Sequence, residues 1–293
     1  MTQLPRLYPD PFPAIHPVPE YQASGQVARW YGEVKAVLQV PWMGVVTMAY
    51  AHYPTFFGEL WRGLGPLVAS APFVEAFQAN RAYIEAAVAE LDPPPIAERL
   101  AALGYAPREV EGIRAAVDVF SHGNHPYALI ATIARLLMEG GEMAGAGEAA
   151  AYEGRHAPEV SVPFVLMEAH HADAPTRAVY EDVKRALGLP FVNTDYRAFA
   201  RWPSYFALAW ADLQPHAGSP AHEALCRAYH ERMVEAARGA LPNPGGLSPA
   251  ALREAATADA PLEEVLAVCR LFQWLLPGLV TNVAYFRQQL LHA

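Results

Sequence analysis

Apolar residues recur at helical spacing along almost the whole chain. In the segment 26–38, Val27, Tyr31, Val34 and Leu38 fall three or four residues apart, which places them on one face of a helix. Similar spacing predicts further helices in the segments 45–62, 72–91, 96–103, 107–138, 194–212, 222–241, 249–257 and 261–291. We therefore expect an all-α fold.

Breaks in this pattern are few. Ser161–Leu166 is the only short candidate for a strand, and an extended linker piece is the alternative. Pro54 and Pro203 fall inside two predicted helices, which each proline should kink or interrupt because it lacks the backbone N–H. We also expect breaks in the helix 107–138, where Gly123 and Pro126 occur.

The chain aligns with itself. Residues 28–66 match residues 177–215 without a gap, at a constant offset of about 149 positions. The shared residues include prolines and tryptophans, which seldom align by chance; they are Tyr31/Tyr180, Val34/Val183, Lys35/Lys184, Pro41/Pro190, Pro54/Pro203, Trp61/Trp210 and Pro66/Pro215. We expect two tandem helical repeats packed as a pseudo-twofold pseudo-dimer, with the shared tryptophans in the core.

The expected boundaries follow from the repeat. The first repeat covers 1–139 and the second covers 172–293. Between them, the segment 140–171 opens with Gly140-Gly141 and has little periodicity, which is typical of a linker. Two domains also fit a length of 293 residues.

Composition excludes several classes of partner. The chain is 53% apolar and 17% charged, with a net charge of −9. Nucleic acid and anionic membranes require clustered Lys and Arg, which we do not find. We therefore expect no nucleic-acid partner and no membrane partner.

The chain has the features of a cytoplasmic protein. It contains two cysteines, too few for a secreted disulfide scaffold. The N-terminal segment 1–20 lacks the basic and apolar regions of a signal peptide. The most apolar stretch, 271–286, is too short to span a bilayer comfortably, and a buried core helix is expected instead.

The two repeats differ at a carboxylate. Asp195 in the second repeat stands opposite Val46 in the first. Asp195 lies in the first turn of a predicted helix, behind Asn193 or Thr194 as the N-cap. One interpretation is that it only complements the helix dipole. The alternative is a general base, since Val46 shows that the fold does not require an acid here.

The two repeats also differ at an amide, and this time the polar residue is in the first repeat. Asn124 in the first repeat stands opposite Leu275 in the second, when Pro126 and Pro277 are aligned. Asn124 either satisfies backbone groups at a helix bend or takes part in chemistry. Because the acid comes from one repeat and the amide from the other, we expect one active site at the pseudo-twofold interface.

Three motifs occur in the order found in a known family. They are Val40-Pro41-Trp42, Phe120-x-x-Gly123-Asn124, and Asn193-Thr194-Asp195-Tyr196 followed by Trp202-Pro203. The chain resembles the group I 2-haloacid dehalogenases over most of its length. That resemblance implies an all-helical fold of two repeats, and hydrolytic removal of halide from a 2-haloalkanoic acid, often of both enantiomers, without a covalent ester intermediate.

The resemblance also assigns roles. Asp195 matches the catalytic aspartate that activates water, and Asn124 matches the asparagine that helps to hold it. The substrate-binding positions are Trp42, Val45, Thr194 and Phe272; a larger aromatic residue is expected in place of Val45. The implied partners are a 2-haloacid and water, with no cofactor, no metal and a homodimer as the candidate assembly. We also hypothesise that backbone N–H groups at the helix starts near 44–45 and 193–194 bind the substrate carboxylate.

Other interpretations remain open. An alkylhydroperoxidase-like protein would need paired redox cysteines, and Cys226 and Cys269 are far apart in the sequence. A non-enzymatic binder of small carboxylic acids is a further alternative. His222, Cys226 and His230 share one helix face, which indicates either a metal site or an ordinary amphipathic face.

Overall fold

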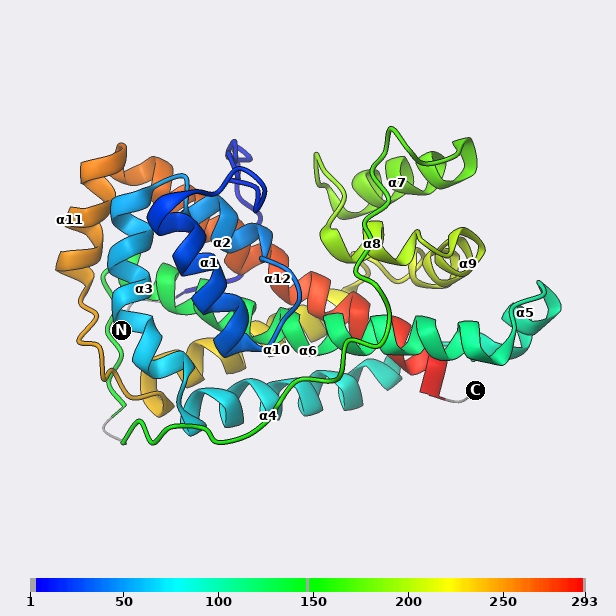
Figure 1. Ribbon diagram of the computed structural model, residues 1–293, viewed down its shortest axis with the longest axis horizontal. Helices are drawn as coiled ribbons and strands as arrows, with labels where there is room; N and C mark the ends of the chain where they lie inside the picture. Colours follow the sequence, from blue (N-terminus) through cyan, green and yellow to red (C-terminus); the bar gives the residue numbers. More distant parts are fainter. Residues whose placement is uncertain (1–3, 146–147, 292–293) are drawn as a thin grey trace. The chain divides into compact units, whose positions relative to one another are not determined.

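The computed structural model describes residues 4–145 and 148–291, and in these residues the chain forms helices and no strand (Figure 1). The expected all-α fold is confirmed. The helices are α1 (Gly25–Leu38), α2 (Val45–Tyr50), α3 (Pro54–Val68), α4 (Ala71–Ala87), the 3₁₀ helix η1 (Val88–Leu91), α5 (Ala97–Ala102), α6 (Pro107–Met138), α7 (Ala174–Leu187), α8 (Thr194–Phe199), α9 (Pro203–Leu213), α10 (Pro220–Glu235), the π helix η2 (Ala236–Ala240), α11 (Pro249–Asp259) and α12 (Leu262–Leu291).

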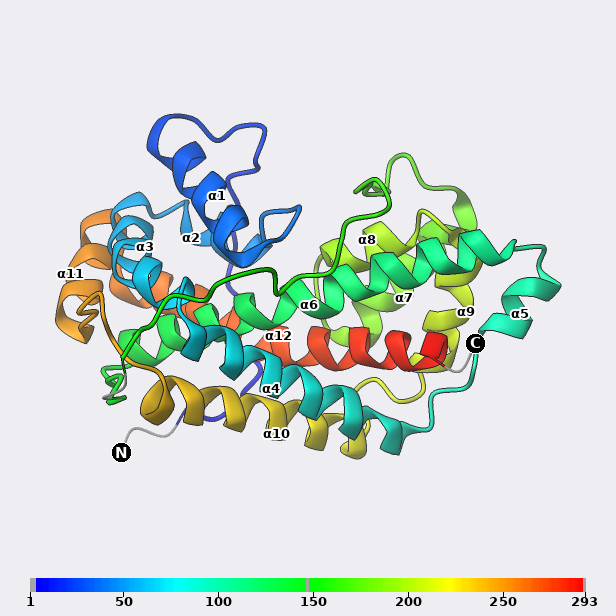
Figure 2. The ribbon, with the colours of Figure 1, turned by 60° about the horizontal axis from the view of Figure 1, so that its bottom comes forward.

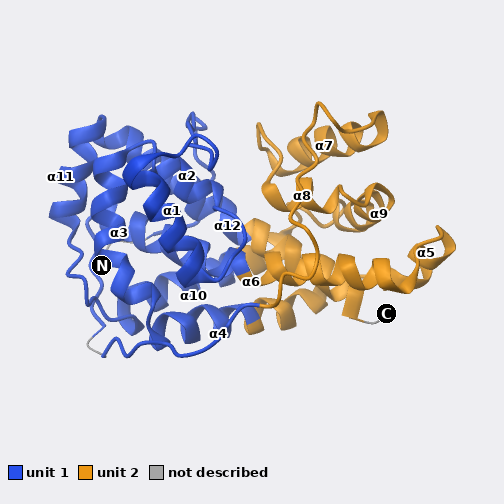
Figure 3. Cartoon of the chain, in the orientation of Figure 1, with its two compact units in different colours: residues 1–81, 123–157, 227–277 blue, residues 82–122, 158–226, 278–293 orange. Residues whose placement is uncertain are grey.

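The described chain divides into two compact units (Figure 3). Unit 1 comprises residues up to 81 together with 123–157 and 227–277, and unit 2 comprises 82–122, 158–226 and the residues from 278. The long helices α4, α6, α10 and α12 each contribute residues to both units. Each unit therefore contains parts of both sequence repeats, and the boundaries 1–139, 140–171 and 172–293 stay a prediction.

In unit 1, α3 packs against α1, α2 and α11, and Figure 2 shows α11 beside α3 as Figure 1 does. The buried face of α3 includes Phe57, Leu60 and Leu64. Trp61 is also buried, and its indole Nε1 donates a hydrogen bond of 2.8 Å to Glu33 on α1. This bond satisfies the polar atom of a core tryptophan.

In unit 2, α9 packs against α7 and α8 in the same way. Trp210 is buried, and its Nε1 donates to Asp182 on α7 at 2.7 Å. Trp210 and Asp182 lie 149 positions after Trp61 and Glu33, which is the offset between the two sequence repeats. The expectation that both tryptophans lie in the core is confirmed, and the matched contacts support the predicted duplication.

The prolines expected inside helices mark the start of new ones. Pro54 begins α3 and Pro203 begins α9, so the expected helix 45–62 is two helices, and the expected helix 194–212 is also two. Tyr53 before Pro54 has φ −107° and ψ 82°, outside the helical region, as the residue before a proline prefers. At the first position of a helix the missing N–H costs nothing.

Helix α6 continues from Pro107 to Met138 without the breaks that Gly123 and Pro126 led us to expect. One missing backbone bond is outweighed here by burial, because nearly all residues from Val117 to Met138 are buried. Ser161–Leu166 forms no strand.

Helix α12 is long and apolar enough to cross a membrane by length and composition, but 72% of its most apolar window is buried within the fold. It is a core helix, as expected for the stretch 271–286.

The linker is held in place by hydrogen bonds. In unit 1 the side chain of Gln39 donates to the carbonyl of Gly154 and accepts from the backbone of His156 and Ala157. In unit 2 the backbone of Met167 donates to the Arg197 carbonyl at 2.9 Å. The linker is therefore docked along much of its described length and is more than a flexible tether.

Candidate active site

The indole of Trp42 packs closely against helix α6 at Gly123. The indole is buried, and a Cβ added at Gly123 would lie 2.3 Å from its Cη2 atom. The Tyr127 hydroxyl donates to the Trp42 carbonyl at 2.9 Å. A Cβ at Gly44 would in turn lie 2.9 Å from the Tyr127 ring. Both glycines thus permit a close approach that sets Trp42 beside the turn of α6 carrying Asn124.

Asn124 lies in the middle of α6 and is 4% exposed. The alternative interpretation placed this amide at an interrupted helix, but α6 is continuous here. A buried amide inside an apolar helix costs free energy unless its polar atoms find partners. A role of Asn124 in chemistry stays a prediction.

The other two substrate-binding positions expected in unit 1 come from α2 and α12. Phe272 is buried, and its ring meets that of Tyr50 edge to face, with centroids 6.1 Å apart. Tyr50 ends α2, the helix that begins at the half-buried Val45. The packing thus brings Phe272 against the helix of Val45.

In unit 2, the short helix α8 carries Thr194 and Asp195. Asn193 occupies the N-cap position, as expected, but its side chain makes no capping bond, and its buried Oδ1 has no hydrogen-bond partner among the described residues. Thr194 is buried, and its hydroxyl accepts a long 3.4 Å bond from Arg197.

Asp195 lies in the first turn of α8 and is 2% exposed. An acid that only complemented the helix dipole could do so at the surface, whereas burying a carboxylate costs several kcal/mol unless it is compensated. Asp195 is thus a buried carboxylate at the start of a short helix, and its role as the general base stays a prediction. Its counterpart Val46 is buried at the same place in α2.

A buried polar chain leads away from the residue that follows Asp195. The Tyr196 hydroxyl accepts a 2.9 Å bond from the Asn282 amide, and the Asn282 oxygen is 2.7 Å from His222 Nε2. Burial raises the pKa of Tyr196 well above its usual range, so the phenol stays protonated. This chain was not predicted from the sequence, although the polar pair Thr281-Asn282 inside an apolar stretch was a signal for it.

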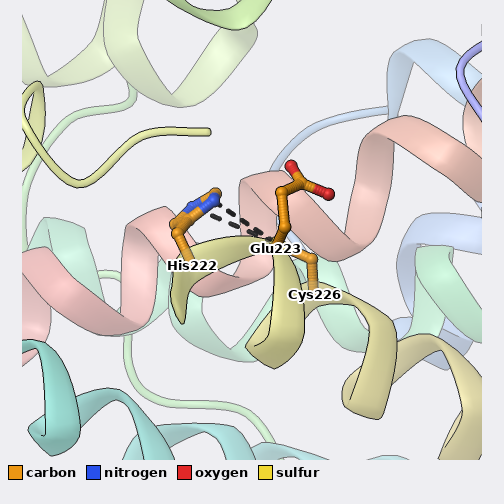
Figure 4. Close-up of side chains that lie close together, drawn as sticks. All are labelled: His222, Glu223 and Cys226. Carbon is orange, nitrogen blue, oxygen red and sulfur yellow. Dashed lines mark hydrogen bonds between the residues drawn. The ribbon is translucent and has the colours of Figure 1, made fainter. Parts of the chain in front are cut away.

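The three residues expected on one helix face, His222, Cys226 and His230, do not form a single cluster. His222, Glu223 and Cys226 on α10 hold potential ligand atoms within 4.8 Å of one another, and the dashed lines in Figure 4 join His222 to Cys226. His230 bonds instead to the carbonyl of Leu4 in unit 1. Because His222 Nε2 is already bonded to Asn282, we interpret this cluster as part of the buried polar chain.

Comparison with known proteins decides the family. No protein-family model matches the chain. An (R)-2-haloacid dehalogenase from Rhizobium sp. (strain NHG3) is 47% identical over 248 residues, which are 84% of this chain and 96% of that protein. The chain belongs to the 2-haloacid dehalogenase family.

Other 2-haloacid dehalogenases match over similar lengths. An (R)-2-haloacid dehalogenase from Pseudomonas putida is 38% identical over 285 residues, 94% of this chain and 93% of that protein. A configuration-inverting 2-haloacid dehalogenase from Pseudomonas sp. (strain 113) is 25% identical over 207 residues, 68% of this chain and 66% of that protein.

Solved structures of the family share the fold. The crystal structure of a D-2-haloacid dehalogenase mutant has a TM-score of 0.84 at 34% identity, covering 99% of this chain and 100% of that one. A complex of a D-2-haloacid dehalogenase mutant with D-2-CPA has a TM-score of 0.84 at 35% identity, covering 99% of both chains. The family named by the sequence motifs is therefore confirmed.

Proposed function

We propose that this chain hydrolyses (R)-2-haloalkanoic acids to 2-hydroxyalkanoic acids. The observation that carries the proposal is the 47% identity to an (R)-2-haloacid dehalogenase over 96% of that protein's length. The match in fold to a D-2-haloacid dehalogenase mutant in complex with D-2-CPA supports it. The two relatives whose names specify (R)-2-haloacids are 47% and 38% identical to this chain, which supports the R enantiomer as the substrate over activity on both enantiomers.

In the proposed reaction, the Asp195 carboxylate takes a proton from a water molecule. The water oxygen attacks C2 of the substrate from the side opposite the halogen, and the electron pair of the carbon–halogen bond leaves with the halide. The configuration at C2 is inverted because there is a single displacement. Asp195 then returns the proton to solvent. Positioned general-base catalysis contributes about 10²–10⁴-fold to such a step.

The remaining residues hold the reactants. We assign Asn124 to the attacking water, and Trp42, Val45, Thr194 and Phe272 to the substrate. The burial of Trp42, Asn124, Thr194 and Phe272 supports these roles, because a site shielded from bulk water strengthens the interactions within it. Oriented water also avoids much of the entropic cost of a bimolecular reaction.

Free halide release from D- and L-2-chloropropionate tests the function. We expect the purified protein to release halide from the D enantiomer and to produce L-lactate. Asp195→Asn, which preserves size and shape, should lose at least about 10²-fold in rate while keeping the circular dichroism spectrum of the native protein. Absence of halide release by the native protein would contradict the proposed function, and tight substrate binding without turnover would support the non-enzymatic binder.

Oxygen-18 labelling separates the two hydrolytic mechanisms. In a single turnover in H₂¹⁸O with excess enzyme, direct attack puts ¹⁸O into the hydroxy acid. An aspartyl ester intermediate would instead leave ¹⁶O in the product and ¹⁸O in Asp195. Mass spectrometry of the lactate therefore decides between them.

The proposal includes cofactor-independent turnover by a cytoplasmic homodimer. Dialysis against a chelator should leave the rate of halide release unchanged, and loss of rate that a metal restores would contradict it. Size-exclusion chromatography with light scattering tests the dimer. The alkylhydroperoxidase-like alternative is disfavoured, because it needs paired redox cysteines, whereas Cys226 and Cys269 are 43 residues apart in the sequence, buried, and form no disulfide.

A further inference from the structure

Helix α8 needs an anchor outside itself. It has six residues, and isolated helices shorter than about 12 residues are marginal in water. Asp195 lies in its first turn. The direction of the proposed catalytic carboxylate therefore depends on what fixes this turn in unit 2.

The ring of Tyr196 provides one part of the anchor. It is fully buried, and it is stacked on Phe206 with centroids 6.0 Å apart and an interplanar angle of 27°. The rings of Trp210 and Phe286 meet it edge to face at 6.0 and 6.3 Å. Aromatic neighbours on three sides restrict how the ring can tilt.

The hydroxyl of Tyr196 provides the other part. The amide nitrogen of Asn282 donates to it at 2.9 Å, so the amide oxygen is left to accept from His222 Nε2 at 2.7 Å. All three residues are at most 2% exposed. Cys226 extends the chain, with its sulfur 3.7 Å from His222 Nδ1. In this environment each hydrogen bond is costly to break, since a buried polar atom would lose its partner.

This polar chain belongs to the repeat that carries the acid. On the predicted alignment, Tyr196 corresponds to Thr47 and Asn282 to Ala131 in the first repeat. Among the described residues, the hydroxyl of Thr47 donates to the carbonyl of Gly44 in its own helix turn. The scaffold therefore exists without such a chain, and the chain occurs where Val46 is replaced by Asp195.

We propose that Tyr196 and Asn282 are positioning residues, which hold the first turn of α8 so that the Asp195 carboxylate points at the attacking water. The inference rests on the proposed function. A displacement of about 1 Å in a reacting group can cost about 10²-fold in rate, so a defect in positioning should act on kcat more than on substrate binding.

The test compares Tyr196→Phe with a matched control, Tyr205→Phe. Tyr205 is also fully buried in unit 2, but its hydroxyl has no partner among the described residues. Both variants lose one oxygen atom from a buried ring. We expect Tyr196→Phe to lower kcat for halide release from D-2-chloropropionate by about 10- to 10²-fold with KM changed less than threefold, and Tyr205→Phe to keep the native kcat.

Asn282→Ala and the double variant Tyr196→Phe/Asn282→Ala complete a double-mutant cycle, which tests whether the two residues act on kcat together. If both residues act through the same hydrogen bond, the double variant should have the kcat of the slower single variant, and multiplied losses would overturn the coupling. A lower melting temperature with native kcat in Tyr196→Phe would mean that the chain only stabilises the fold. That outcome leaves the proposed function standing, whereas a native protein that releases no halide defeats both.

Discussion

Gly123 and Trp42 are in such close contact that position 123 has no room for a methyl group. An added Cβ would lie 2.3 Å from the indole Cη2 atom and 2.9 Å from Val40 Cγ1. Ala normally stabilises a helix interior by up to about 1 kcal/mol relative to Gly. Here the overlap should reverse the sign, because overpacking a core costs about 1–3 kcal/mol.

We therefore predict that Gly123→Ala lowers the free energy of unfolding by about 1–2 kcal/mol and reduces halide release, because it displaces Trp42 from the turn that carries Asn124. Urea denaturation and steady-state kinetics measure the two effects. Gly32→Ala on α1 is the matched control, since a Cβ there meets no atom within 4 Å apart from its chain neighbours and the local helix backbone. It should be neutral or stabilising. Equal stability of both variants would contradict the role of Gly123.

Asn124→Ala separates catalysis from folding. If Asn124 holds the attacking water, its removal should lower kcat by about 10²-fold. Asn80→Ala is the control, because Asn80 is equally buried, at 4% exposed, and accepts a hydrogen bond from Arg232, which is not among the assigned site residues. The control should lose about 1–3 kcal/mol of stability and little activity. Loss of stability without loss of kcat in Asn124→Ala would return the residue to a structural role.

The sequence allowed the helices to be located but did not settle what each proline does. The predicted bounds of α6 and α12 agree with the structure to within one residue. Both helices have a long run of apolar residues at helical spacing, which is the strongest signal for a helix in a sequence. The interruption expected at Pro54 is confirmed, because Tyr53 leaves the helical conformation and Pro54 begins a new helix. Pro126, in contrast, is tolerated inside α6, where burial outweighs one lost bond.

The candidate site was only partly accessible from sequence. Asp195 and Asn124 could be selected because the two repeats differ there, and this comparison needs no structure. The chain from Tyr196 to Asn282 was not selected. Its partners are 86 residues apart and meet through tertiary packing, so the polar pair Thr281-Asn282 does not by itself show which residue it contacts. Gly123 was similarly interpreted as a helix breaker, whereas the structure shows it as a contact surface for Trp42.

His230 should make the fold sensitive to acid. It is 1% exposed and its Nε2 lies 2.6 Å from the Leu4 carbonyl, and burial lowers its pKa to about 4. The unfolded chain, with an ordinary histidine pKa of about 6.5, binds more protons between these values, so stability falls as the pH drops through that window. The loss attributable to His230 is at most roughly 3 kcal/mol at pH 4.

Urea denaturation at pH 7 and at pH 4.5 measures this dependence. His230→Gln should reduce the difference in unfolding free energy between the two pH values. The control His171→Gln changes an exposed histidine and should leave the difference unaltered. Equal pH dependence in the native protein and in His230→Gln would show that other groups cause the acid sensitivity.

Val45 should set how long a substrate chain the enzyme accepts. The family resemblance expects a larger aromatic side chain at this position, and Val45 is half-buried at the start of α2. A smaller side chain leaves space that one or two additional methylene groups could fill, each worth about 0.8 kcal/mol when buried. The native protein should therefore retain most of its kcat/KM when D-2-chloropropionate is replaced by D-2-chlorobutyrate. Val45→Phe should lower kcat/KM for the longer acid by about 10-fold or more relative to the shorter one.

The control is Val37→Phe, which adds the same bulk at a half-buried valine on α1, outside the assigned substrate positions. It tests whether any added bulk has this effect. An unchanged ratio of the two substrates in Val45→Phe would remove Val45 from the substrate-binding set.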